Sequence, residues 1–141
     1  MDNITNILLV EDNPADARLI VEVFKDTNVK NRIHVVKDGV EAMDFLNKEN
    51  EYIDAPKPHI ILLDLNLPRK DGREVLKEVK MDEDLKSIPI VILTTSSAGE
   101  DVIKTYNNHA NCYITKPVDF DQFLMVINAI EDFWLRVVEL P

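Results

Sequence analysis

Five side chains suited to handling a cation and a phosphoryl group stand directly after short apolar runs of the chain: Glu11, Asp12, Asp64, Thr94 and Lys116. Mg²⁺ prefers oxygen ligands and is usually bound by one or two carboxylates together with waters and phosphate oxygens. A carboxylate can also attack phosphorus as a nucleophile. Ammonium and hydroxyl groups stabilise the charge that moves during phosphoryl transfer. If these side chains meet in space, the chemistry they suit is metal-assisted transfer of a phosphoryl group to a carboxylate.

The apolar runs themselves cover residues 7–10, 60–63, 90–93 and 112–115. Unbroken runs of this length, bounded by turn residues, are typical of strands that are buried on both faces of a parallel sheet. Ligands of such open α/β sheets bind just beyond the carboxyl ends of the strands. We therefore expect three carboxylates, a hydroxyl and an ammonium group to converge at one edge of the sheet.

Segments with helical spacing separate the runs, so that strand and helix alternate five times along the chain. A further strand is predicted at residues 33–36. Asn13 is a suitable helix cap, and Pro14 occupies the first helical position after it. The predicted helices cover residues 13–25, a segment that follows Asp38-Gly39, and residues 72–79, 100–108 and 120–138.

The composition indicates one soluble domain. A chain of 141 residues can bury a core of its own. Its formal charge of -10 disfavours nucleic-acid binding, which needs a basic surface. We find no apolar stretch near 18 residues and no signal sequence, which disfavours a membrane location. The lone Cys112 permits no internal disulfide, so we expect a cytoplasmic protein with Cys112 as a small buried residue.

Each motif alone also has a plain structural explanation. Glu11-Asp12 can cap a helix, Asp64 can begin a turn, and Lys116 can be a solvated lysine at a strand end. The polar loop at residues 47–58 is longer than usual for a helix-to-strand connection. It is either a surface feature or a partner contact.

The combination of Glu11-Asp12, Asp64, Thr94 and Lys116-Pro117 resembles the receiver domain of two-component response regulators. The resemblance covers nearly the whole chain, and the order, residue types and strand ends all agree. It implies an α/β fold with a doubly wound, five-stranded parallel sheet in the order 2-1-3-4-5, the flavodoxin-like (βα)5 receiver fold. It also implies a single receiver domain over residues 1–141 without a separate output domain.

The resemblance implies that Asp64 accepts a phosphoryl group from a phosphohistidine of a sensor histidine kinase. The implied cofactor is Mg²⁺, ligated by Asp12, Asp64 and the backbone carbonyl of Asn66, with Glu11 acting through a bound water. On this view the protein is a phosphoacceptor that assists its own phosphorylation and dephosphorylation, and is not an enzyme acting on other substrates.

Three further roles follow from the same resemblance. Lys116 pairs with the phosphoryl oxygens, and the Thr94 hydroxyl moves to hydrogen-bond one of them. Tyr113 matches an aromatic switch position, although a half-buried strand aromatic explains it equally well. Thr95 departs from the family, which usually has a small residue there, and its bulk could slow access of water to the phosphoryl group.

With no output module, the expected output is a binding event that phosphorylation controls. The predicted last helix has two apolar stripes where a surface helix normally has one. The main stripe consists of Phe120, Leu124, Ile127, Ile130, Trp134 and Val138. We expect a homodimer through this helix, the alternative being a terminus that folds back on the domain. The end of the chain and the 47–58 loop resemble stand-alone regulators paired with phytochrome-like histidine kinases.

Two other functions compete with the phosphorylation switch. One is a constitutive binding module with a receiver fold that no longer takes phosphate. The other is a hydrolase with Asp64 as nucleophile. Such a phosphatase would need a second carboxylate two residues later as general acid, where this chain has Asn66.

Overall fold

The computed structural model describes residues 4–26, 30–94, 112–115, 121 and 125. Its strands are β1 (Thr5–Val10), β2 (Asn31–Val36), β3 (Ile60–Asp64), β4 (Ile90–Thr94) and β5 (Cys112–Thr115). Its helices are α1 (Pro14–Lys25), α2 (Gly39–Asn47), the 3₁₀ helix η1 (Asn50–Tyr52) and α3 (Gly72–Met81). The predicted helix at residues 100–108 lies outside the described residues. Of the predicted helix at 120–138, only residues 121 and 125 are described, and both are helical.

The strands form one parallel sheet in the order β2-β1-β3-β4-β5. β1 lies next to β3, with Val10 opposite Leu63. The residues that follow β1 therefore lie beside the end of β3, although more than fifty positions separate them in the sequence. The α/β fold with a parallel sheet, predicted from the apolar runs, is confirmed.

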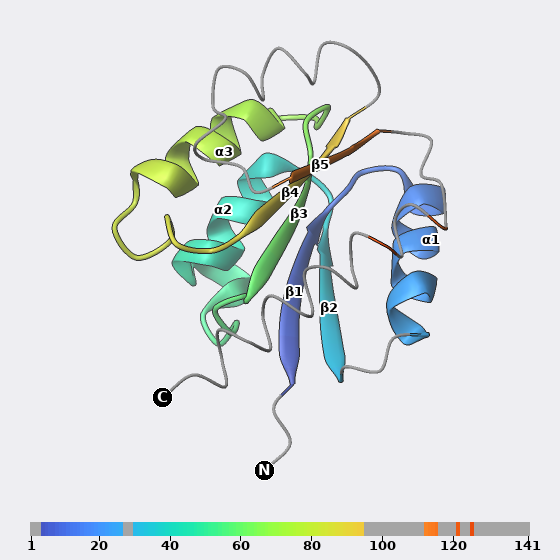
Figure 1. Ribbon diagram of the computed structural model, residues 1–141. Coiled ribbons are helices and arrows are strands. Elements are labelled where there is room, and N and C mark those ends of the chain that lie inside the picture. Colours follow the sequence, from blue (N-terminus) through green and yellow to red (C-terminus); the bar gives the residue numbers. More distant parts are fainter. Residues whose placement is uncertain (1–3, 27–29, 95–111, 116–120, 122–124, 126–141) are drawn as a thin grey trace.

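Helices cover both faces of the sheet: α1 lies on one side, and α2 and α3 lie on the other (Figure 1). Along β1, Ile7 and Leu9 belong to the core beneath α1, whereas Leu8 and Val10 belong to the core beneath α2 and α3. This alternation is the two-residue period of a strand. Burying each such side chain contributes roughly 1.5–3 kcal/mol. The two cores together fix β1 and β3 at the centre of the domain.

Each of the three described α-helices begins with a side-chain cap. The Asn13 side chain accepts the amide hydrogens of Ala15 and Asp16, with Pro14 at the first helical position, as predicted. Asp38 caps α2 and Asp71 caps α3 in the same manner. Because a cap satisfies amides that have no partner within the helix, it also fixes the residue at which the helix starts.

Several element boundaries differ from the prediction by one or two residues. β1 and β2 each begin two residues earlier, at Thr5 and Asn31, because polar residues extend the parallel ladder beyond the apolar runs. The loop at 47–58 contains η1, and the Tyr52 ring lies 5.4 Å from the Phe45 ring, centroid to centroid. The loop is therefore anchored to the core and does not simply extend into solvent.

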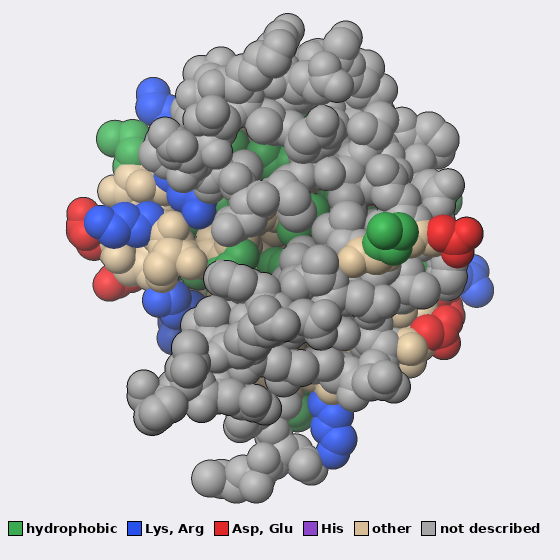
Figure 2. Space-filling model, viewed as in Figure 1, with side chains coloured by type: hydrophobic (Ala, Val, Ile, Leu, Met, Phe, Trp, Pro, Cys, Tyr) green, Lys and Arg blue, Asp and Glu red, His purple; other side chains and the backbone are tan. Residues whose placement is uncertain are grey.

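Charged side chains of both signs gather on the α3 side of the molecule, on the left in Figure 2. Lys70 pairs with Glu78 at 2.7 Å, and Lys86 pairs with Glu83 at 2.8 Å. Exposed pairs of this kind contribute little to stability. Among the described helices, none combines the length and apolar character needed to cross a membrane.

Candidate functional site

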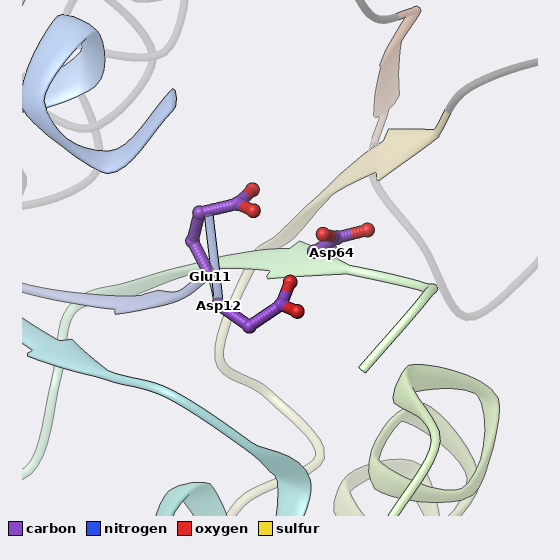
Figure 3. Close-up of side chains that lie close together, drawn as sticks. All are labelled: Glu11, Asp12 and Asp64. Atoms are coloured by element: carbon purple, nitrogen blue, oxygen red, sulfur yellow. The ribbon is translucent and has the colours of Figure 1, made fainter. Parts of the chain in front are cut away.

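Three carboxylates meet where β1 and β3 end. Glu11 and Asp12 directly follow β1, and Asp64 is the last residue of β3. One oxygen of each lies within 4.8 Å of the others, and the side chains face a common space (Figure 3). The structure thus brings together the three acidic side chains that we expected to meet at this edge.

Two of the three carboxylates are buried. Glu11 is 1 % exposed and Asp64 is 2 % exposed, whereas Asp12 is exposed. Carboxylates placed this close repel one another, and their removal from water raises the cost of their charge. The attraction of a bound cation to each carboxylate would offset both effects. The cluster therefore favours a cation as part of the site.

The backbone directs both buried carboxylates. Asp64 Oδ1 accepts a hydrogen bond of 2.9 Å from the Asn66 amide. Glu11 Oε1 accepts one of 3.1 Å from the Asn13 amide. Asn13 is also the cap of α1, so Glu11 lies at the positive end of that helix, where a negative charge is stabilised. In each case an amide two residues further along the chain sets the orientation of the side chain.

The donor set fits Mg²⁺. All three residues offer carboxylate oxygen, the ligand that Mg²⁺ prefers. Octahedral Mg²⁺ binds oxygen at 2.0–2.1 Å, so two of its ligands are at most about 4.2 Å apart. The observed 4.8 Å limit requires only a small inward adjustment of side chains. Together, the oxygen donors and their spacing bear out the Mg²⁺ cofactor expected from the sequence.

A glycine lets α3 begin directly against the end of β3. A Cβ atom on Gly72 would lie 2.2 Å from the Asp64 carbonyl oxygen and 2.7 Å from the Leu65 Cα. The Gly72 amide donates to the Leu65 carbonyl at 3.1 Å. No functional role for Gly72 was predicted from the sequence. The signal that could have identified it is the Asp-Gly pair before a predicted helix, which occurs at 38–39 and again at 71–72.

The remaining expected site residues are described only in part. Thr94 follows Leu93, the register partner of Asp64, and is itself paired with Thr115. The backbone of Thr94 therefore lies at the same edge of the sheet as the carboxylates. The side chains of Thr94, Tyr113 and Cys112 lie outside the described part of the structure, as does the whole of Lys116. Their roles stay predictions.

Comparisons with known proteins agree with this geometry. The family profile of the response regulator receiver domain matches residues 7–128. Response regulator Rcp1 of Synechocystis sp. is 50% identical over 135 residues, which cover 96% of this chain and 92% of the relative. The crystal structure of the Mn²⁺-bound form of Rcp1 superposes with a TM-score of 0.81 and 50% identity, covering 97% of this chain and 99% of that one.

A second solved structure is the phosphorylated cyanobacterial phytochrome response regulator RcpA. It superposes with a TM-score of 0.82 and 49% identity, covering 99% of both chains. One similar protein has thus been seen with a divalent metal and another with a phosphoryl group. The profile match, the length of the aligned regions and the identities lead to one conclusion: this chain is a two-component signalling protein and belongs to the response regulator receiver domain family.

Proposed function

We propose that this protein is a single-domain response regulator that accepts a phosphoryl group on Asp64 from a sensor histidine kinase, in a reaction that depends on Mg²⁺. The observation that carries the proposal is the carboxylate cluster, in which Asp64 is buried at a strand end and its oxygen lies within 4.8 Å of those of Glu11 and Asp12. A helix cap or a turn would need no such convergence.

The chemistry is a phosphoryl transfer between side chains. An oxygen of Asp64 attacks the phosphorus of a phosphohistidine, the new O–P bond forms, and the N–P bond to the imidazole breaks. The Asn66 amide orients the nucleophile through its bond to Oδ1. When bound, Mg²⁺ supplies positive charge that offsets the negative charge of the phosphoryl oxygens. Such transfers depend mostly on positioning and electrostatics, and both require the carboxylates to be fixed.

The proposed residue roles are those that the family resemblance implies. Asp12, Asp64 and the Asn66 carbonyl ligate the metal, and Glu11 acts through a water. The backbone amide of Asn66 hydrogen-bonds to the Asp64 side chain. The backbone of Asn66 therefore lies next to Asp64, which is consistent with its carbonyl as a metal ligand. Lys116 pairs with the phosphoryl oxygens, Thr94 hydrogen-bonds one of them, and Tyr113 follows the movement of Thr94.

The proposal extends to the architecture and partners of the protein. Residues 1–141 form one (βα)5 receiver domain in the cytoplasm, with five strands in the order 2-1-3-4-5. The last helix forms a homodimer, and phosphorylation changes the surface that a partner reads. The phosphoryl donor is a phytochrome-like histidine kinase, which the similarity to the phytochrome response regulator RcpA supports.

Labelling with a small phosphodonor tests the central step. Incubation with Mg²⁺ and acetyl phosphate should add the mass of one phosphoryl group, in a bond that hydroxylamine cleaves. Asp64→Asn should abolish the gain, whereas Asp54→Asn, a change of the same type at an exposed position, should leave it intact. The gain should also vanish with excess EDTA.

The same experiment separates the competing functions. A protein that gains no mass, either from acetyl phosphate or from a phosphorylated histidine kinase, is the constitutive binding module. Continuous release of phosphate from a model ester at enzymatic rates would instead indicate a hydrolase. Labelling that persists in Asp64→Asn would disprove the assignment of the acceptor.

A further inference from the structure

The segment that follows Asp64 is packed against the start of two helices. We call residues 65–71 the acceptor loop. Gly72 brings the start of α3 against the beginning of this loop, as described above. Near the end of the loop, a Cβ on Gly39 would lie 2.1 Å from the Lys70 carbonyl oxygen and 2.7 Å from the Lys70 Cβ. Gly39 is the first residue of α2, so the backbone of α2 touches the backbone of the acceptor loop.

A side-chain contact joins the same two elements. Arg69 Nη1 lies 3.2 Å from Asp38 Oδ2. The Asp38 side chain is only 10 % exposed, and its other oxygen caps α2 by accepting the Glu41 amide at 2.8 Å. One buried carboxylate therefore fixes the start of α2 and also binds the acceptor loop.

The backbone of Arg69 shows that the loop is constrained at this point. Its φ is +64°, in the left-handed region that residues other than glycine rarely adopt. Such a conformation persists only when the surroundings favour it. The contacts with Asp38 and Gly39 occur at Arg69 and at the next residue, where that support is needed.

We infer that Asp38, Gly39 and Arg69 are positioning residues for the metal and for the acceptor, an inference that rests on the proposed function. They belong to the start of α2 and to the acceptor loop, and lie outside the carboxylate cluster. A shift of the acceptor loop would move Asn66, and with it the amide that orients Asp64. The start of α2 thereby sets the geometry of a site to which it contributes no ligand.

Arg69→Gln tests this inference because two effects of the substitution predict opposite changes in Mg²⁺ affinity. The substitution removes a positive charge, so electrostatics alone would strengthen Mg²⁺ binding. Loss of positioning would weaken Mg²⁺ binding. Substitution of residues that orient metal ligands typically weakens metal binding by about tenfold or more, and we expect the same here. Calorimetric titration of the whole protein with MgCl₂ measures the dissociation constant. Lys70→Gln is the matched control, since it removes the same charge one residue later, from a lysine that pairs with Glu78 on α3.

Gly39→Ala tests the backbone contact. Its methyl group would force the Lys70 carbonyl away, and we expect Mg²⁺ binding to weaken about tenfold or more. Leu46→Ala, at the opposite end of α2 and buried in the core, controls for general loss of stability. It should lower the melting temperature while leaving the Mg²⁺ dissociation constant within about twofold of wild type.

Hydrogen exchange of the metal-free protein provides a second readout. The Gly72 and Asn66 amides, which bond to Leu65 and Asp64, should exchange faster in Arg69→Gln and Gly39→Ala than in Lys70→Gln. Weaker Mg²⁺ binding with faster exchange in either test variant supports the inference. If both variants bind Mg²⁺ as Lys70→Gln does, the inference is wrong; if Gly39→Ala does not fold, Arg69→Gln alone decides.

The outcomes also separate this inference from the proposed function. A wild-type protein that neither binds Mg²⁺ nor becomes labelled on Asp64 contradicts the proposed function. A wild-type protein that does both, with test variants that match the Lys70→Gln control, contradicts only the positioning role.

Discussion

Gly72→Ala should disturb both the stability and the chemistry of this domain. The new Cβ would lie 2.2 Å from the Asp64 carbonyl oxygen, while ordinary contacts begin at 3.4 Å, so the helix and the strand must separate by about 1.2 Å. Overpacking against backbone costs about 1–3 kcal/mol, and the better helix propensity of alanine offsets roughly 0.5–1 kcal/mol. We expect a net loss of about 1–2 kcal/mol in the free energy of unfolding.

The effect on phosphorylation should be larger than the loss of stability suggests. A displacement of about 1 Å at a reacting group can cost roughly a hundredfold in rate, and the Asp64 backbone is what the new methyl group strikes. Urea unfolding measures the free energy of unfolding, and the initial rate of labelling by acetyl phosphate measures the rate of phosphorylation. Lys77→Ala, an exposed change on the same helix, is the control. If Gly72→Ala matches wild type in both stability and rate, the close approach of α3 is not a constraint on the site.

Three further predictions concern other parts of the domain. Asn13→Ala should lower the free energy of unfolding by about 1 kcal/mol, and Asn13→Ser should recover most of it in urea titrations, because serine retains the cap. Burial, followed by the charge of Arg32, lowers the pKa of His34 below 6.5, so the unfolded chain binds more protons there and stability should fall on acidification below pH 6.5. Arg32→Gln should raise that pKa in an NMR titration, and an unchanged value would refute the charge effect. Burial, with a smaller effect of Glu41, raises the pKa of Tyr52 to about 12, so stability should fall as the pH rises from 10 towards 12. Tyr52→Phe should remove an ultraviolet transition near pH 12, and its persistence would refute the assignment.

Much of the fold could be predicted because the signals are local. A strand buried on both faces must be apolar at successive positions, and β3 is buried along its entire length. The start of α1 was equally clear, since Asn13 and Pro14 each favour one position at a helix start. The polar beginnings of β1 and β2 were missed because Asn6 and Asn31 carry no apolar signal. Their place in the ladder comes from backbone bonds to neighbouring strands, which periodicity does not report.

The part of the site that lies at strand ends could be predicted from the sequence. Glu11, Asp12 and Asp64 converge because β1 and β3 are neighbours and run parallel. The contact between Asp38 and Arg69 was not predictable, since it joins the start of α2 to the acceptor loop and depends on a left-handed residue in that loop. Nothing in the residue types indicates that pairing. It follows from the tertiary structure alone.

Because side chains alternate between the two faces along β3, the direction of the Asp64 side chain depends on its place in that alternation. Asp64 has the same parity as Leu62, whose side chain lies in the core beneath α1, while Leu63 belongs to the core on the opposite face. Insertion of a single residue between Ile60 and Leu63 would therefore turn the acidic group towards α2 and α3, even if the sheet survived the exchange of its apolar residues. A two-residue insertion would restore its direction. Within β3, only an insertion of an even number of residues keeps the direction of Asp64.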